Sequence, residues 1–145
     1  SLKQVLTWLL IVVLLVVFMD LLMYALEVEV VPPWSEEVYE STDSLLFLLL
    51  ALVVLAPLTE EFVFRGFLFQ GFLHRMGPVW AVVFSALPWA LLHVFQYEWL
   101  HLLLILMLGI VLGVARWKTG SLVVPLIMHG FNNFLATLEI VFLSS

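Results

Sequence analysis

The chain has 145 residues, of which 65% are hydrophobic and 11% are charged, with a formal net charge of −6. A mean hydropathy of +1.21 leaves too little polar surface to cover a soluble globule, so the composition indicates an integral membrane protein. The acidic balance argues against nucleic-acid partners, which require a basic surface. Because the chain contains no cysteine, disulfides, thiolate nucleophiles and cysteine-ligated metals are excluded.

The first apolar run covers residues 2–26, and a span takes about 20 apolar residues, so this run is long enough to cross a bilayer. Asp20 falls in its last turns, where it reaches the interface or faces other helices. Residues 27–43 contain acidic but no basic side chains, and we interpret them as a loop with Trp34 and Tyr39 at the headgroups. Since the chain begins with serine rather than methionine, the presence of a further helix beside these spans stays an open question.

Four further apolar segments are expected to complete a bundle of five spans. The second span runs from Leu45 toward Met76, and Pro57, which has no backbone N–H, is expected to kink it. We therefore expect an all-α, polytopic transmembrane bundle. Three shorter segments follow at residues 79–95, 99–115 and 121–143. The bundle is interpreted as one domain over 1–145, divided into an accessory span (1–26), an acidic extracytoplasmic loop (27–43) and the helical core that carries the site (45–143).

Basic residues indicate the orientation of the bundle. With five spans, four of them fall on one side of the membrane and the acidic segment falls on the other. The positive-inside rule places the basic side, and with it the N-terminus, in the cytoplasm. These basic residues are Lys3, Arg75, Arg116 and Lys118.

Gly109 and Gly113 form a Gly-x-x-x-Gly ridge in the fourth span. Such a ridge lets another helix approach closely. We expect close packing within the bundle, and the same face is the candidate surface for a homo-oligomer.

Two carboxylates and a guanidinium interrupt the second span at Glu60, Glu61 and Arg65. Charged groups within a membrane are costly and mark functional sites. Residues four apart share a helix face, so Glu61 and Arg65 are expected to pair. Glu60 lies about 100° round the helix, so it is the carboxylate without a local partner and the candidate general base. A purely structural clamp between helices is the alternative interpretation.

Polar residues in the later spans lie at a similar depth. At about 1.5 Å per residue, Glu60, His93 and His129 come out roughly 16–22 Å from the cytoplasmic turns. Asn133 follows His129 by four residues, so both project from one face. The other two histidines, His74 and His101, sit at helix ends and are interpreted as interfacial.

Two kinds of chemistry fit this set. In the first, Glu60 and His93 deprotonate a water while His129 and Asn133 donate hydrogen bonds to a developing oxyanion. In the second, Glu60, His93 and His129 bind a divalent metal such as zinc, with one position left open. No cofactor is demanded by the local spacing, because the His-Glu-x-x-His signature is absent.

The three motifs resemble those of the CAAX protease and bacteriocin-processing family of intramembrane endopeptidases. That family carries Glu-Glu-x-x-x-Arg, then an aromatic residue shortly before a His, then His-x-x-x-Asn, on separate helices. Here they read Glu60-Glu61 to Arg65, Trp89 to His93, and His129 to Asn133. The resemblance covers roughly residues 45–140. It departs from the usual pattern in Trp89, where Phe is commoner, and in the short chain, which puts a deep prenyl cavity in doubt.

The resemblance implies an intramembrane protease that acts on a peptide or membrane-protein segment in the bilayer of a prokaryotic cell. Glu60 would be the water-activating base, His93 its partner, His129 and Asn133 the oxyanion stabilisers, and Glu61 with Arg65 orienting groups. Members have been described both as metalloproteases and as glutamate-dependent enzymes, so the metal stays open. Two alternatives also stay open: an inactive interaction or bacteriocin-immunity protein, and a proton- or ion-coupled carrier.

Overall fold

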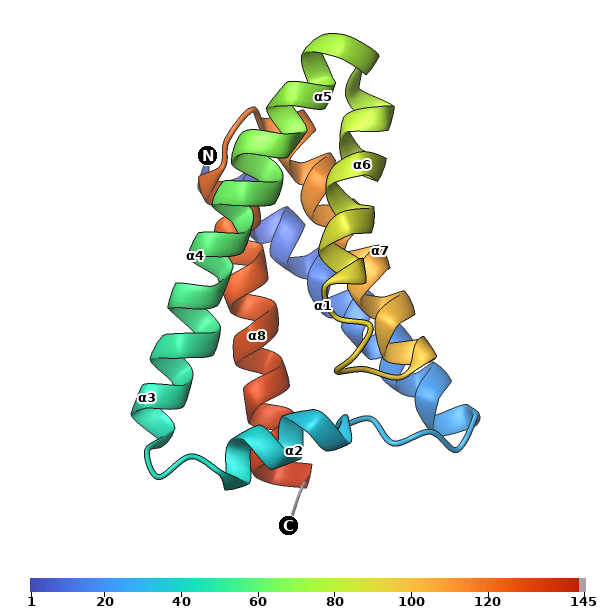
Figure 1. Ribbon diagram of the computed structural model, residues 1–145, viewed down its shortest axis with the longest axis vertical. Coiled ribbons are helices and arrows are strands. Elements are labelled where there is room, and N and C mark those ends of the chain that lie inside the picture. Colours follow the sequence, from blue (N-terminus) through green and yellow to red (C-terminus); the bar gives the residue numbers. More distant parts are fainter. Residues whose placement is uncertain (144–145) are drawn as a thin grey trace.

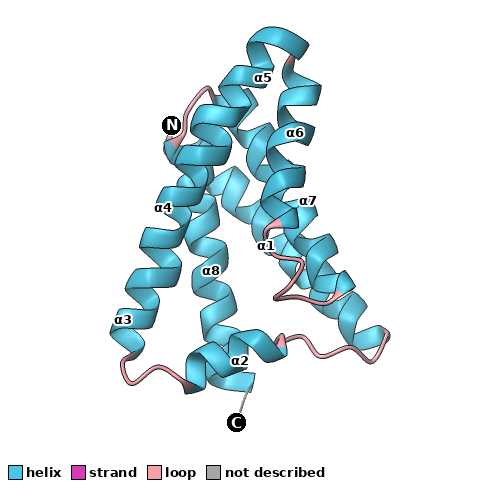
Figure 2. Ribbon diagram, in the orientation of Figure 1, coloured by secondary structure: helices cyan, strands magenta, loops and turns pink. Residues whose placement is uncertain are grey.

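The structure is a computed structural model that describes residues 1–143, and within that range it is built from helices and connecting turns without strands (Figure 2). This confirms the expected all-α bundle. In chain order the elements are α1 (Leu2–Ala25), α2 (Pro33–Glu40), α3 (Leu45–Leu49), the π-helical η1 (Leu50–Leu55), α4 (Ala56–Glu61), the π-helical η2 (Phe62–Leu68), α5 (Phe69–Met76), α6 (Pro78–Leu91), α7 (Trp99–Thr119) and α8 (Val123–Leu143).

The described residues contain four helical stretches long and apolar enough to cross a bilayer: Leu2–Ala25, Leu45–Met76, Trp99–Thr119 and Val123–Phe142. The chain is an integral membrane protein. The remaining expected span, residues 79–95, is shorter than expected, because α6 has 14 residues and ends at Leu91. Pro88 removes a donor near its end, and tight turns follow, with His93 N bonded to Ala90 O at 3.0 Å.

The two ends of the bundle differ in charge. In Figure 1 the N-terminus and the α5–α6 and α7–α8 connections lie at one end, and α2 with the C-terminal end of α8 lies at the other. The basic residues identified from the sequence belong to the first end, and the acidic segment to the second. The basic residues and the acidic segment therefore lie at opposite ends of the bundle, as the sequence analysis predicted. That the basic end faces the cytoplasm stays a prediction.

The acidic segment was expected to be a loop throughout, but it contains the helix α2. Pro32 is extended and Pro33 occupies the first turn, where its missing N–H is not needed. The amide of Ser35 then bonds to the carbonyl of Pro32 at 2.9 Å. Trp34 packs against the ring of Tyr97 with centroids 5.7 Å apart, so α2 is held against the α6–α7 connection.

The long helix from Leu45 to Met76 changes its hydrogen-bond register around Pro57. In η1 the amide of Ala56 bonds to the carbonyl of Ala51, five residues earlier. In the same register the next amide, at Pro57, would serve the carbonyl of Leu52, but proline has no N–H. In place of the expected kink, the helix has a π-helical stretch in which the carbonyl of Leu52 receives no backbone hydrogen bond. A second such stretch, η2, follows directly after Glu61, and π-helical turns frequently occur at functional sites.

Small residues let the spans approach closely. A Cβ on Gly109 would lie 2.9 Å from a ring carbon of Trp89, and one on Gly113 would lie 3.1 Å from Val82. The predicted glycine ridge therefore packs against α6 of the same chain, and an oligomer would need another surface. At Gly130 an added Cβ would lie 2.8 Å from the carbonyl oxygen of Val53, so α8 touches the backbone of η1 there.

Candidate active site

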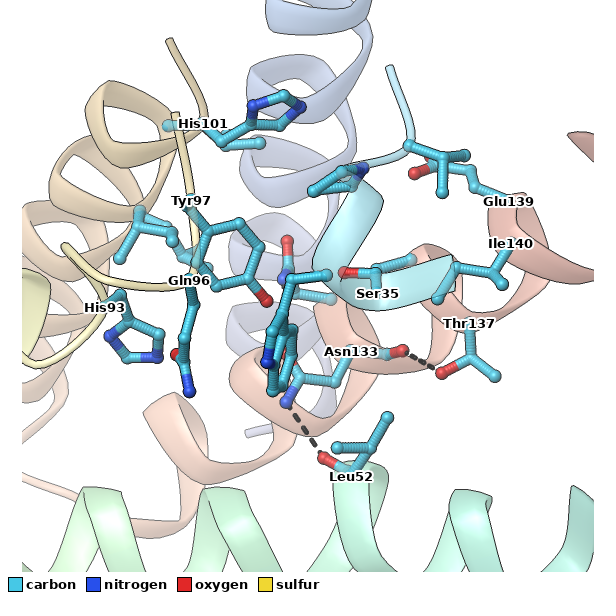
Figure 3. Close-up of a pocket in the computed structure, with 18 of the residues that line it drawn as sticks. Ser35, Leu52, His93, Gln96, Tyr97, His101, Asn133, Thr137, Glu139 and Ile140 are labelled. Atoms are coloured by element: carbon cyan, nitrogen blue, oxygen red, sulfur yellow. Dashed lines mark hydrogen bonds between the residues drawn. The ribbon is translucent and has the colours of Figure 1, made fainter. Parts of the chain in front are cut away.

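A cavity of about 400 Å³ lies between the spans and is lined by residues from all three motif-bearing segments and their neighbours (Figure 3). We refer to it as the central cavity. It brings together the residues expected from the sequence to share one depth. Those in its lining are Glu60, Trp89, His93, His129 and Asn133.

The predicted pair of Glu61 and Arg65 is present behind the cavity wall. Arg65 Nη1 donates to Glu61 Oε1 at 2.8 Å, and the two side chains are 0% and 1% exposed. The guanidinium also donates to the carbonyl of Gly109 at 3.1 Å and lies 4.6 Å from the ring centroid of Trp89. A buried charge paired in this way is costly to unpair, so this cluster ties α4 and η2 to α6 and α7.

Glu60 projects into the cavity and is the more accessible carboxylate, with its side chain 27% exposed. Its Oε2 accepts a hydrogen bond from the indole Nε1 of Trp89. The same oxygen lies 3.9 Å from Nε2 of His129. As expected from the sequence, Glu60 has no partner on its own helix; its partners are Trp89 of α6 and His129 of α8.

The contacts of His129 define its tautomer. Nδ1 lies 2.9 Å from Glu61 Oε1, and since a carboxylate only accepts, Nδ1 carries the hydrogen. In the neutral ring Nε2 then keeps its lone pair, on the side of Glu60. Glu61 Oε1 thus binds both Arg65 and His129, and it orients the imidazole toward the cavity.

The sequence analysis placed His93 on a helix, but in the structure it lies in the turn after α6. Its Nδ1 is 2.8 Å from the carbonyl of Trp89, so Nδ1 donates and Nε2 is left open. His93 and Glu60 both line the cavity, but no hydrogen bond or ion pair joins them among the described residues. The nearest imidazole partner of Glu60 in this arrangement is His129.

Asn133 has a structural partner. Its Nδ2 donates to the carbonyl of Leu52 at 2.9 Å, which is the carbonyl that Pro57 cannot serve (Figure 3). The hydroxyl of Thr137 in turn donates to the carbonyl of Asn133 at 2.7 Å. This amide therefore replaces a missing helical hydrogen bond and fixes α8 against η1.

Sequence reasoning missed the far part of the cavity. His101, expected at the interface, is only 4% exposed and lines the cavity with Tyr97, Asp20 and Glu139. A signal was available, because aromatic rings recur every fourth residue across the turn, at Trp89, His93, Tyr97 and His101. Successive centroids lie 5.4, 5.9 and 6.4 Å apart. Burial raises the pKa of the Tyr97 hydroxyl, a shift that a hydrogen bond with Ser35 opposes.

The candidate metal ligands do not gather around one point. Within residues 1–143 no three His, Asp or Glu side chains are placed closely enough to share an ion. Glu60 and His129 approach each other, but His93 does not complete a set with them. The residues as arranged do not fit a three-ligand metal site.

Comparison with known proteins agrees with the motifs. Residues 42–135 match the family described as type II CAAX prenyl endopeptidase Rce1-like. The chain belongs to this family. The match includes every motif residue from Glu60 to Asn133 and leaves out α1, α2 and the end of α8.

A relative from Escherichia coli, known only as an uncharacterized 24.3 kDa protein, is 33% identical over 94 residues. That alignment covers 62% of this chain and 42% of the relative, so the chain spans less than half the length of that protein. No solved structure matches the chain.

Proposed function

We propose that the chain is an intramembrane endopeptidase that hydrolyses a peptide or membrane-protein segment with a water activated by Glu60 and His129. Family membership supports the reaction class. The observation that carries the proposal is the placement of Glu60 Oε2 3.9 Å from His129 Nε2 at the wall of the central cavity. A carboxylate and an imidazole lone pair facing each other across a gap form a site for a water that donates to both.

The chemical roles follow from the hydrogen bonds. Glu60 takes a proton from the water while the oxygen of the water attacks the scissile carbonyl carbon. Glu60 then returns that proton to the leaving amine when the C–N bond breaks. The indole of Trp89 orients the carboxylate. His129 is held by Glu61, so its lone pair points at the water rather than rotating away. This assigns to His129 the partner role that the sequence suggested for His93.

His93 is assigned to the developing oxyanion. Its Nδ1 is occupied by the Trp89 carbonyl, so Nε2 is the free position and, once protonated, a donor. Asn133, the other residue first considered for this task, has its amide engaged with Leu52. In the proposal it acts indirectly, by holding α8 and therefore His129 in place.

The test is a peptidase assay on the purified full chain in lipid nanodiscs, using a peptide mixture read by mass spectrometry. Glu60→Gln keeps the shape of the side chain and should lower the cleavage rate by about 10²–10⁴-fold, the range for a general base. Glu98→Gln, which removes an exposed carboxylate outside the cavity, is the matched control. Undiminished cleavage by the Glu60→Gln protein refutes the proposal. A parallel arm with chelator tests the metal, which the mechanism does not use.

A further inference from the structure

Gly109 of α7 belongs to none of the three motifs, yet it meets the candidate site in two ways. Its carbonyl accepts a hydrogen bond from Nη2 of Arg65 at 3.1 Å. Its missing side chain leaves room for the indole of Trp89, because a Cβ on Gly109 would lie 2.9 Å from Cε3 and 3.2 Å from Cζ3 of that ring. Both the backbone of Gly109 and its lack of a side chain therefore bear on the site.

The indole of Trp89 is enclosed by other members of the site. Trp89 is only 2% exposed. Cζ of Arg65 lies over its ring, 4.6 Å from the centroid. The rings of His129 and His93 meet it in edge contacts, with centroids 5.2 and 5.4 Å away. Because buried side chains are closely packed, the position of the indole is fixed by these neighbours together with Gly109.

The position of the indole decides where the Glu60 carboxylate is held. The one polar side-chain atom of Trp89, Nε1, donates to Oε2 of Glu60. That oxygen is the one that lies 3.9 Å from Nε2 of His129. Within residues 1–143 the Glu60 carboxylate accepts no other hydrogen bond. A displaced indole would therefore either pull the carboxylate with it or leave the carboxylate unheld.

We propose that Gly109 is a positioning residue for hydrolysis, because the absence of its side chain allows Trp89 to hold Glu60 beside His129. The inference rests on the proposed peptidase function and adds to it a residue from a helix that carries no motif. Gly109 touches no reacting atom and acts through the indole.

The size of the expected effect follows from the contact distances. Ordinary contact between carbon atoms begins at about 3.4 Å, so an alanine Cβ at this position would push the ring away by about 0.5 Å or more. Since a misplacement of about 1 Å can cost about 10²-fold in rate, Gly109→Ala should lower kcat by about 10- to 100-fold at unchanged KM. Alanine keeps the carbonyl that binds Arg65, so the substitution isolates the effect on the indole.

Gly113 on the same ridge provides the matched control. A Cβ there would lie 3.1 Å from Cγ1 of Val82, and its three nearest heavy atoms all belong to Val82 rather than to Trp89. Gly113→Ala therefore crowds the interface of α6 and α7 without displacing the indole. It should lower the melting temperature while kcat for a peptide that the wild type cleaves stays unchanged.

A spectroscopic measurement distinguishes positioning from packing. The chain has six tryptophans, so in the ¹⁵N-labelled chain in nanodiscs the indole N–H of Trp89 is the resonance that Trp89→Phe removes. Its hydrogen bond to a carboxylate is charge-assisted, so this resonance should lie downfield and move upfield in Glu60→Gln. Gly109→Ala should move it in the same direction, and adding Glu60→Gln should then shift it little further. Gly113→Ala should leave it in place.

A second background covers the case in which Gly109→Ala does not fold. Phenylalanine at position 89 is smaller than tryptophan and has no N–H. In the Trp89→Phe chain, Gly109→Ala should therefore cost less in melting temperature and lower kcat no further. If the double variant is as unstable as Gly109→Ala alone, the cost does not come from the indole and the proposal is overturned.

The remaining outcomes separate this proposal from the peptidase itself. A Trp89 resonance that Gly109→Ala leaves unchanged overturns the positioning role, as does an equal loss of kcat in Gly113→Ala. Neither result bears on whether the chain hydrolyses peptides. Conversely, a wild type that cleaves nothing refutes the peptidase, while the indole resonance still shows whether Gly109 controls the position of Glu60.

Discussion

Asn133→Ala distinguishes two roles for a residue that both the motif and the structure single out. In the structure the side-chain amide of Asn133 donates a hydrogen bond to the carbonyl of Leu52 at 2.9 Å. That carbonyl has no backbone donor, because Pro57 lacks an N–H. Alanine removes the side-chain donor, so the carbonyl is left unsatisfied between packed spans. The expected consequence is a loss of stability rather than a selective loss of catalysis.

The magnitude follows from this geometry. An unsatisfied buried acceptor costs about 1–3 kcal/mol, and hydrogen bonds between membrane helices reach about 1–2 kcal/mol, so Asn133→Ala should lower the free energy of unfolding by about 1–2 kcal/mol. Pro57→Ala restores a backbone N–H that can serve Leu52. In that background Asn133→Ala should cost less, giving a coupling energy of at least about 0.5 kcal/mol.

The assay is reversible unfolding in mixed detergent micelles, followed by the far-ultraviolet circular dichroism of the four proteins in the cycle. Because the coupling energy is a difference of differences, the packing lost with the Pro57 ring cancels. A coupling energy near zero refutes the structural role. A loss of 10²–10³ in the cleavage rate at unchanged stability would instead restore the oxyanion role.

Three other changes test the packing, the buried charges and the topology. Glu61→Ala leaves its buried arginine partner unpaired and should cost about 3–5 kcal/mol in unfolding free energy; a melting temperature equal to that of wild type contradicts this. Gly130→Ala places a Cβ 2.8 Å from a backbone oxygen and should cost about 1–3 kcal/mol, whereas Gly71→Ala, with open space around it, should not. Single cysteines at positions 36 and 118 should react with an impermeant reagent from opposite sides of the membrane.

Local spacing was sufficient to predict the charge pair. Glu61 and Arg65 are four residues apart, so one helix brings them together without help from the rest of the fold. Depth along a span is nearly as local, because rise per residue is fixed. That is why Glu60, His93 and His129 could be assigned to one layer, and all three line one cavity.

Which of these residues touch could not be read from spacing, because azimuth and helix ends are set by tertiary packing. The sequence paired Glu60 with His93, but α6 ends at Leu91 and His93 turns its Nδ1 to the Trp89 carbonyl. The closer partner, His129, is held by Glu61, a contact across 68 positions of sequence that no local pattern encodes.

The π-helical stretches show a second limit. Pro57 predicted a lost hydrogen bond, but the chain had two ways to accommodate it, a kink or a wider turn. In the structure the missing donor comes from Asn133 of α8, a partner that local sequence does not identify. Likewise α2 is a short, acidic helix whose stability comes from contacts such as Trp34 on Tyr97 rather than from its own sequence.

Glu60 and Glu61 are adjacent in sequence, yet the structure predicts different consequences for them. Glu61 Oε1 binds Arg65 at 2.8 Å and His129 at 2.9 Å, so one atom serves both the packing of the bundle and the orientation of the imidazole. A variant at Glu61 must therefore change stability and activity together. Glu60 contacts the rest of the site through Trp89 and His129 and faces the cavity. Only there can chemistry be removed while the fold is kept, which makes Glu60→Gln the decisive substitution.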